Sequence, residues 1–337
     1  MKKQTKIAAG VLISLLMLCA GTSLGSSPIS LYDTLRVVLH KIFTLPLPRG
    51  MDPKNTAIVW NLRFPRALLA FIVGGSLSMS GTVFQSILKN QLASPYILGV
   101  SSGASLGAGL IILTGFSLPF LGGFTLPAAG FIFGLGTVFL VIRFSSRLDN
   151  TLSNNTIILF GMVFSLFVNA LLTTLSALYR EELKNLLYWQ MGSFALKGWS
   201  YVGLMLPFFI LGTLGLIRYT REMDILTFGE EQAKSIGVDT RSIRQKLLIY
   251  SAILTGGAVA LSGAIGFVDL IAPHLARKIT GSNHAYVLPM AFFIGGSLLV
   301  VTDLIARTVV SPSELPVGAI TAIIGAPFFA WVYFKKR

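Results

Sequence analysis

The residue types that perform chemistry in enzymes are few in this sequence, and their spacing does not fit catalysis. Gly99-Val-Ser101-Ser-Gly103 matches the GxSxG pattern, but that serine belongs on a strand-to-helix turn and here enters a long apolar stretch. His274 has no second histidine at ligand spacing, and the single cysteine, Cys19, excludes a disulfide framework and a cysteine metal site. No segment matches the ATP-binding pattern GxxxxGK[ST]. We therefore predict no catalytic residue, no metal site and no cofactor on this chain.

The composition is that of a membrane protein with an excess of positive charge. Hydrophobic residues make up 53% of the 337 residues, and 27 Lys and Arg residues give a net charge of +14. The mean hydropathy is +0.75. Because the basic residues are scattered between apolar runs and form no soluble basic domain, nucleic-acid binding is excluded as the source of this charge. Membrane orientation explains it better.

Apolar runs of about 20 residues, each long enough to cross a bilayer, follow one another along the chain. They predict an all-α polytopic membrane protein with about ten transmembrane helices and a single transmembrane domain over residues 1–337. The eighth run is too short for an ordinary crossing and is expected to be tilted or partly inserted. The predicted spans are 7–26, 64–87, 93–114, 123–143, 155–178, 199–217, 246–266, 268–280, 286–306 and 315–334.

The first run follows three lysines and looks like a secretory signal, but Leu18 stands where a lipoprotein signal needs a small residue. We predict an uncleaved first membrane helix. Residues 32–43 are too charged to span and are expected to form an amphipathic surface stretch.

An even number of spans places both termini on one side, and both are basic, with Lys2-Lys3 at one end and Lys335-Lys336-Arg337 at the other. The positive-inside rule makes that side the cytoplasm, which also receives most of the other basic residues. Several basic residues nevertheless fall on the outer side, among them Arg63, Arg66 and Arg307. An outward basic patch suggests an acidic partner.

Small residues recur at the spacing of helix contacts inside the spans. Gly99, Gly103 and Gly107 form a double GxxxG, and Gly130 and Gly134 form another. Such spacing lets helix backbones approach closely in lipid, so we interpret these glycines as packing residues of a tight bundle.

One polar segment, 218–246, stands out on the cytoplasmic side. Thr227-x-x-Glu230 has the pattern of a capping box, Gly237 is placed to end a helix, and a second start is expected at Asp239 or Thr240. An apolar face is expected from Ile225, Phe228 and Ile236. We predict two short helices that protrude for a soluble protein to bind; the alternative is a solvated loop.

Within this segment, Glu231-Gln-Ala233-Lys-Ser-Ile-Gly237 resembles the EAAxxxG coupling motif of ABC importer permeases. The rest of the chain after the first span resembles the FecCD-type branch, the ferric-siderophore and cobalamin permeases. The matching stretches are RFPR at 63–66, LASPYILGVSSGASLGA at 92–108, WQMGSF at 189–194, GAIGFVDLIAPHLAR at 263–277 and ELPVGAITAIIGAPFF at 314–329.

The resemblance implies the type II ABC importer permease fold, a bacterial plasma-membrane location and a set of partners. These are a second permease subunit, identical or not, two cytoplasmic ATPase subunits and an extracytoplasmic substrate-binding protein. It implies a ferric siderophore as cargo, with cobalamin or haem as alternatives under the same mechanism. A secondary transporter driven by an ion gradient is the alternative from another class, but it needs ionisable groups at mid-membrane, whereas charge here gathers at span ends.

The resemblance also implies roles for single residues. Arg63, Arg66 and Arg307 would pair with glutamates on the binding protein; the alternatives are snorkelling for the first two and an intrahelical pair with Asp303 for Arg307. Glu231, Ala233 and Gly237 would form the contact with the ATPase.

The sequence departs from the family pattern at two positions, and one connection resembles the part of the family that narrows the inner mouth. Gln91 replaces the usual Pro and is expected to loosen a turn; Asp269 replaces a usual Gly and is either a functional carboxylate within the membrane or a residue near water at the span's end. The connection from 145 to 155 would narrow the inner mouth. Ser153 and Asn154 are the gate candidates there, with helix capping as the alternative.

Overall fold

The computed structural model describes residues 3–25, 29–45, 52–149 and 152–335, and this part of the chain contains helices but no strand. Short π and 3-10 segments, η1 (Ile58–Arg63), η2 (Pro95–Leu98) and η3 (Gly122–Phe124), precede three of the long helices. The α-helices are α1 (Lys3–Ser23), α2 (Leu31–Phe43), α3 (Pro53–Ala57), α4 (Phe64–Ile87), α5 (Val100–Thr114), α6 (Thr125–Leu148), α7 (Asn154–Leu178), α8 (Leu183–Gln190), α9 (Trp199–Arg218), α10 (Thr220–Phe228), α11 (Glu230–Ser235), α12 (Thr240–Ser262), α13 (Val268–Thr280), α14 (His284–Thr308) and α15 (Val317–Lys335).

The long helices confirm the polytopic all-α class. Within the described residues, 7 helices are long and apolar enough to cross a membrane, and α5 and α15 are shorter apolar helices. The short eighth run forms α13, which has 13 residues. The predicted span 93–114 is not one helix, because Gly99 adopts φ +76° and separates η2 from α5. The count of ten crossings therefore stays a prediction.

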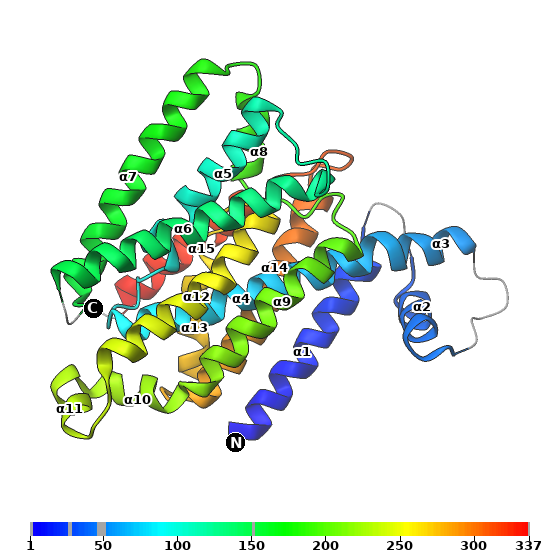
Figure 1. Cartoon of the computed structure of the whole chain (residues 1–337). Helices are drawn as coiled ribbons and strands as arrows, with labels where there is room; N and C mark the ends of the chain where they lie inside the picture. Colours follow the sequence, from blue (N-terminus) through cyan, green and yellow to red (C-terminus); the bar gives the residue numbers. More distant parts are fainter. Residues whose placement is uncertain (1–2, 26–28, 46–51, 150–151, 336–337) are drawn as a thin grey trace.

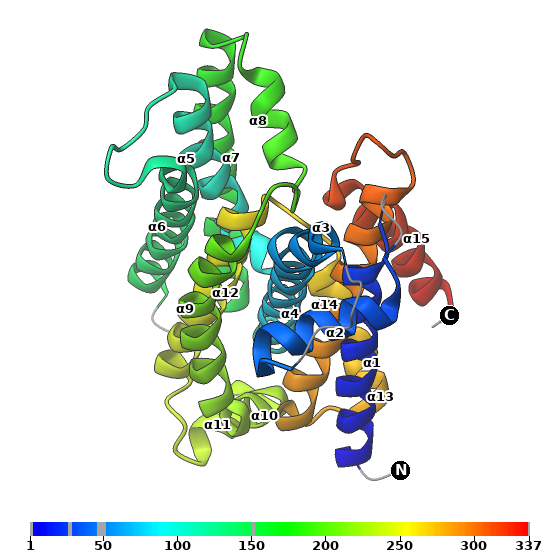
Figure 2. The same cartoon turned by 90° about the vertical axis from the view of Figure 1, so that its right-hand side faces the viewer.

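The helices form a bundle with α4 near its middle (Figures 1 and 2). Helix α4 packs against α14, α12, α13 and α9, and almost all of its length is buried. Helices α5, α6 and α7 form one flank, and α1 covers α14 on the other. The marked chain ends and the α10–α11 segment lie toward the lower left of Figure 1, and α2 and α3 lie at the opposite end. Following the orientation predicted from the sequence, we call these the inner and outer ends.

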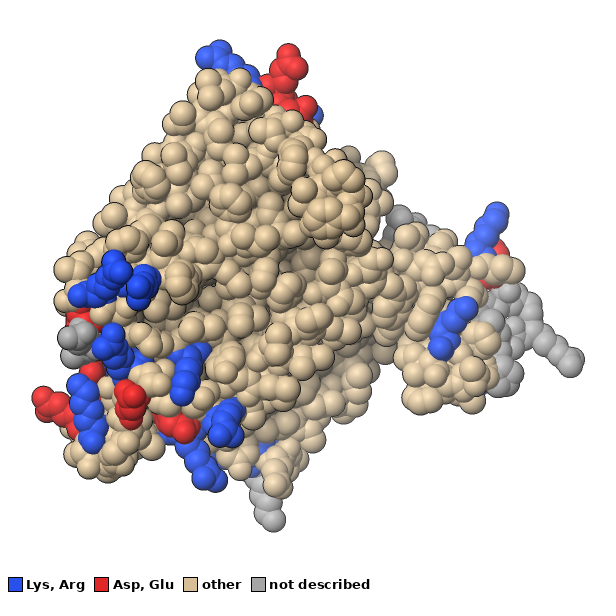
Figure 3. Space-filling model, viewed as in Figure 1, with Lys and Arg blue, Asp and Glu red and all other residues tan. Residues whose placement is uncertain are grey.

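Charge is distributed along the bundle as a membrane requires. On the face that Figure 3 shows, Lys, Arg, Asp and Glu gather near the two ends, and a broad band without them lies between. The amphipathic stretch expected at 32–43 is confirmed as α2, whose N-terminus is capped by the Ser30 hydroxyl accepting a hydrogen bond from the amide of Asp33 at 3.0 Å.

Glycines set the closest helix contacts. A Cβ on Gly74 of α4 would lie 2.4 Å from the carbonyl oxygen of Gly295 on α14, so only glycine permits this approach. In the same way, a Cβ on Gly107 of α5 would lie 2.4 Å from the carbonyl of Ala129 on α6. The expectation that the GxxxG glycines serve packing is confirmed for this residue, since lipid itself gives apolar helices little reason to associate.

Candidate functional site

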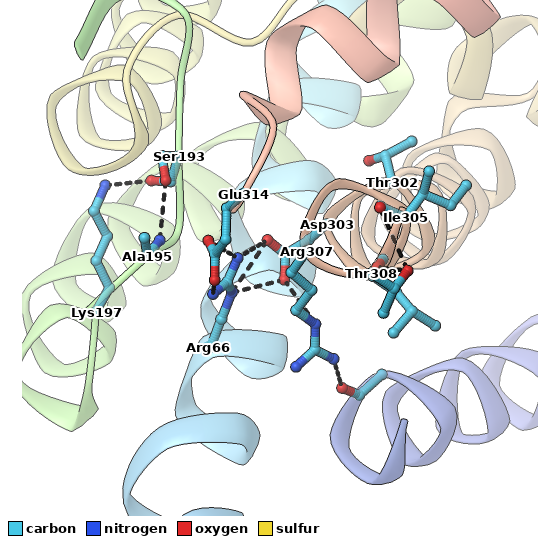
Figure 4. Close-up of polar contacts among 12 residues, drawn as sticks. Arg66, Ser193, Ala195, Lys197, Thr302, Asp303, Ile305, Arg307, Thr308 and Glu314 are labelled. Carbon is cyan, nitrogen blue, oxygen red and sulfur yellow. Dashed lines mark hydrogen bonds and ion pairs between the residues drawn. The ribbon is translucent and has the colours of Figure 1, made fainter. Parts of the chain in front are cut away.

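The outer end of the bundle holds a cluster of charged side chains from three elements (Figure 4). Arg66 lies in the first turn of α4, Asp303 lies near the end of α14, and Glu314 follows α14 in the connection to α15. The Arg66 guanidinium donates from Nε to Asp303 Oδ2 at 2.9 Å and from Nη2 to Asp303 Oδ1 at 2.8 Å. It also donates from Nη1 to Glu314 Oε1 at 2.8 Å and from Nη2 to Oε2 at 2.9 Å. One arginine thus joins two carboxylates in a bidentate arrangement with each.

Burial makes the Arg66–Asp303 pair costly to break, whereas the Glu314 side of the cluster is open to solvent. The Asp303 side chain is 3% exposed and that of Arg66 is 12% exposed, whereas Glu314 is 36% exposed. A carboxylate that is almost fully buried needs a charged partner, because its hydration is lost. We call Arg66, Asp303 and Glu314 the outer clamp.

Arg63 and Arg307 both bind backbone carbonyls at the outer end of α1. Arg63 is buried, and its Nη1 donates to the carbonyl of Ser23 at 2.6 Å. Arg307 donates from Nη2 to the carbonyl of Gly21. The last carbonyls of a helix lack partners within the helix and carry the negative end of its dipole, so two guanidinium groups are stabilising there.

The structure therefore brings the three predicted arginines together and gives each an internal partner. The alternative pair of Arg307 with Asp303 is present, with Arg307 Nε 3.9 Å from Asp303 Oδ2. Arg63 does not extend to the membrane surface as snorkelling would require, since its guanidinium lies among protein atoms. The role of the three arginines in docking stays a prediction.

Sequence reasoning missed two members of this region, Glu314 and Lys197. Glu314 opens the stretch ELPVGAITAIIGAPFF, so its position was visible, but nothing in the sequence shows that the chain returns to Arg66. Lys197 precedes α9, and its Nζ donates to the carbonyl of Ser193 at 2.6 Å. Burial and the neighbouring charge of Arg66 lower the pKa of Lys197 to about 7.

The inner end carries the coupling segment predicted over 218–246. Two short helices, α10 and α11, are followed by α12, and Asp239 caps α12 by accepting from the amide of Ser242 at 3.1 Å. The predicted capping box is wrong, because Thr227 donates its hydroxyl to the carbonyl of Asp224 at 2.6 Å and Gly229 precedes α11 instead. The helix start predicted at 239 or 240 is confirmed by α12, and the helix predicted to end at Gly237 is α11; α10, which precedes them, was not predicted.

Gly237 ends the second coupling helix, as predicted. It adopts φ +85°, which L side chains rarely do, and its amide donates to the carbonyl of Lys234 at 3.0 Å. No atom lies within 4 Å of the place that a Cβ would take, so the backbone conformation is what requires glycine.

The three residues of the coupling motif face different surroundings. Glu231 and Gly237 are exposed, whereas Ala233 is fully buried within the segment. Of the three residues expected to form an apolar face, Phe228 and Ile236 are 79% and 64% exposed and Ile225 is half-buried. Phe228 and Ile236 therefore present exposed apolar surface on the segment, whereas the Ala233 side chain packs inside it.

The gate candidates make internal contacts at the start of α7. The amide of Ser153 donates to Asp149 Oδ2 at 2.9 Å, and its hydroxyl lies 3.0 Å from that of Thr156. Asn154 Nδ2 donates to the carbonyl of Leu88 at the end of α4, at 3.1 Å. The Asp149 carboxylate therefore accepts from a backbone amide at the start of α7, whereas the Ser153 side chain makes no capping hydrogen bond there. Residues 150 and 151 of the connection lie outside the described residues, and a gate role stays a prediction.

The departures from the family pattern also have defined places. Asp269 is 1% exposed and accepts from the Ser94 hydroxyl at 2.5 Å, so the expectation that it lies near water is wrong. Gln91 is exposed in the turn after α4, where Asn90 Oδ1 accepts from the amide of Leu92 at 2.9 Å and keeps the turn closed.

Comparison with known proteins identifies the framework that carries these clusters. Residues 12–335 match the FecCD transport family. The chain belongs to the FecCD transport family. It is 43% identical over 317 residues to the uncharacterised ABC transporter permease protein YvrB of Bacillus subtilis, covering 94% of this chain and 90% of that protein.

Other relatives of this FecCD permease differ in what they are named for. The hemin transport system permease protein HmuU of Yersinia pestis is 38% identical over 83% of this chain and 84% of its own length. Relatives from Haemophilus influenzae, Klebsiella pneumoniae and Escherichia coli, named for molybdate, vitamin B12 and Fe(3+) dicitrate, are 33% to 36% identical over 83% to 87% of this chain and 84% to 87% of their own lengths. A solved structure of a metal-chelate type ABC transporter in an inward-facing conformation matches with a TM-score of 0.85 and 32% identity, covering 98% of both chains.

The first prediction concerns the outer clamp. Asp303→Asn should destabilise the FecCD permease by about 3 kcal/mol, because it leaves the nearly buried Arg66 with only its more exposed partner. Glu314→Gln is the matched control and should cost less than about 1 kcal/mol, since its side chain is partly in water. Thermal unfolding in lipid nanodiscs measures both. Equal losses would contradict the ranking.

Acidity provides a second check on the same clamp. The hydrogen bonds from Arg66 lower the pKa of the Glu314 carboxyl below its ordinary value of 4.5. A carboxyl whose pKa is lowered on folding stabilises the folded chain above its ordinary pKa, and this contribution is lost as the pH falls through the lowered value. The difference between wild type and Glu314→Gln should therefore shrink below pH 4.5 and be constant above about pH 5.

Proposed function

We propose that this FecCD permease is the membrane subunit of an ATP-driven importer for a ferric siderophore in a bacterial plasma membrane, with both termini in the cytoplasm. Its partners would be a second permease subunit, two ATPase subunits and an extracytoplasmic binding protein. The observation that carries the proposal is the separation of two different surfaces along one bundle. A protruding, charged coupling segment with two exposed apolar side chains lies at the inner end, and an arginine cluster lies at the outer end.

The coupling segment supports an ATPase partner. Phe228 and Ile236 are exposed in a segment rich in charged residues, which a membrane is not expected to cover. Large apolar side chains surrounded by charged ones mark protein contacts. Exposed Glu231 and Lys234 would supply the polar rim. The lack of a Walker A pattern in the chain agrees with ATP hydrolysis on a separate subunit.

The outer end supports an acidic binding protein. Three arginines face two carboxylates there, so positive charge is in excess even without Lys197, although each arginine has an internal partner. Such an excess attracts an acidic surface and raises the encounter rate without needing a fully exposed arginine.

The mechanism follows from differential affinity for two states. Closing of the ATPases on ATP would move α10 and α11, and the bundle would switch between outward-open and inward-open states. An ATPase can drive this switch only through a contact with the permease, and the coupling segment is the protruding element that offers one. A transporter driven by an ion gradient would need no such contact.

The cargo part of the proposal has support from the likeness to the metal-chelate type transporter and to the hemin permease HmuU, since both concern chelated metals. A ferric siderophore is a chelate of the same kind. Haem and cobalamin are the alternatives.

The second prediction tests the ATPase contact. Phe228→Ser and Ile236→Ser should each weaken retention of the ATPase subunit by about tenfold, because burying one such side chain contributes about 1.5 kcal/mol or more. Co-purification from the native host, followed by titration of the ATPase onto the permease in nanodiscs, measures the loss. Leu196→Ser, which changes an apolar side chain that is 97% exposed near the outer end, is the control and should bind normally. Undiminished binding by both inner variants would remove this surface from the mechanism.

The third prediction uses opposite changes within the outer cluster. Arg307→Gln should slow association of the binding protein and Glu314→Gln should accelerate it, each by about threefold at low salt, because one removes and the other adds net positive charge. Both effects should fade at high salt. Surface plasmon resonance on nanodiscs gives the rates. Changes in the same direction would show that destabilisation, and not charge, is being measured.

The fourth prediction tests cargo and energy source together. Vesicles that contain the permease with its co-purified ATPase and binding protein should take up ferric desferrioxamine B only when ATP is inside, and excess haemin or cyanocobalamin should not compete. Competition by either would reassign the cargo. Uptake driven by an ion gradient without ATP or partners would make the chain a secondary transporter instead.

A further inference from the structure

Three polar side chains that sequence reasoning did not connect meet at the inner end of the bundle. His284, the first residue of α14, lies with Nδ1 2.5 Å from Asp224 Oδ1 on α10 and with Nε2 2.5 Å from Ser86 Oγ on α4. The backbone amide of His284 also donates to Asp224 Oδ1, at 2.9 Å. The chain separates these residues by 60 and 198 positions, so only the fold brings them together.

The arrangement has the residue types of a hydrolase triad, but its surroundings do not suit a nucleophile. Ser86 is 8% exposed, and its hydroxyl also lies 3.0 Å from the carbonyl of Thr82 on its own helix. The His284 ring is 2% exposed. A triad serine must be reached by substrate and must have donors nearby for the oxyanion. The contacts of Ser86 are instead those of a structural hydrogen bond.

The position of Asp224 shows which two elements this contact links. Asp224 belongs to α10, the first helix of the coupling segment, and its carboxylate lies at the N-terminus of α14. A negative charge there interacts favourably with the helix dipole and with the free amides of the first turn. Through the Asp224 carboxylate, α10 of the coupling segment therefore contacts α14, which runs the length of the bundle.

Helices α4 and α14 are joined again at their other ends. At the outer end, the Arg66 guanidinium of α4 pairs with Asp303 of α14. Between the two polar contacts, Gly74 and Gly295 hold the backbones so close that a Cβ has no room. Helix α14 has 25 residues and is therefore about 37 Å long. Because α4 and α14 are joined at both ends and in the middle, we expect them to move as one body.

Resting on the proposed function, we propose that Asp224, His284 and Ser86 form the joint through which the coupling segment moves the α4–α14 pair. His284 and Ser86 are positioning residues: they hold α14 against α4 and present α14 to Asp224. When the ATPases displace α10, the Asp224 carboxylate transmits that displacement to the first turn of α14. The paired helices carry it to the outer clamp.

The experiment compares uptake with ATP hydrolysis in the complete complex. Asp224→Ala and His284→Ala should each lower the amount of ferric desferrioxamine B taken up per ATP hydrolysed by about tenfold, within the range found for mutations that alter coupling. ATPase retention should stay normal. Asp224→Asn keeps an acceptor for the His284 ring and amide, and should restore part of the ratio. Ser86→Ala is the milder variant for the third residue.

Two controls separate a joint from a general structural role. The double variant of Asp224→Ala with His284→Ala should be no worse than either single variant, because residues acting as one unit are not additive. Glu181→Gln, which removes an exposed carboxylate in the connection between α7 and α8, should leave the ratio unchanged. Melting temperatures are measured for every variant.

The outcomes distinguish failure of the joint from failure of the proposed importer function. A wild-type ratio in Asp224→Ala and Ser86→Ala would overturn the joint while leaving the importer intact. Additive losses that follow the melting temperatures would reduce the three residues to structural contacts and would also overturn it. If the wild-type complex shows no ATP-dependent uptake of any of ferric desferrioxamine B, haemin and cyanocobalamin, the proposed function fails, and the joint fails with it.

Discussion

The close contact between α4 and α14 is the constraint on which the rest of the structure depends. Lipid solvates apolar helices as well as their neighbours do, so helix association in a membrane relies on close packing and polar contacts. Here both are present on one helix pair, with glycine at the centre and a charged or polar contact at each end. Helices α1, α9, α12, α13 and α15 contact this pair, and α5 and α6 pack on α12 beside it. The outer clamp and α10 of the coupling segment contact its two ends.

The charged side chains at the outer end of the bundle are likewise placed against polar partners. Arg66 and Asp303 are placed where neither could remain alone, since an unpaired ion in a poorly hydrated site is costly. Arg63 and Arg307 use helix carbonyls in place of a carboxylate. A local excess of positive charge can therefore persist at the outer end without an unpaired arginine, and this reconciles internal pairing with attraction of an acidic partner.

Much of this architecture could be predicted from the sequence, because the signals were local. Apolar runs gave the long helices, Gly237 marked a helix end, and Asp239 marked a helix start. One error arose where a neighbouring residue competed. The capping box at Thr227 failed because α10 continues to Phe228 and Gly229, not Thr227, precedes α11.

The contacts that sequence reasoning could not reach are those between distant segments. Glu314 was visible as an acid and His284 as a histidine, but no periodicity or spacing predicts that they meet Arg66 and Asp224. Pairing across such separations depends on how helices are ordered in the bundle. Only the fold contains that information.

The caps on α1 have a consequence for the order in which the protein is made. The carbonyl of Ser23 is bound by Arg63, 40 positions later in the chain, whereas the carbonyl of Gly21 is bound by Arg307, 286 positions later. The first contact can form once the start of α4 has been synthesised, but the second must await the end of α14. A chain whose synthesis stops before α14 therefore leaves the outer end of α1 with only one of its two guanidinium contacts.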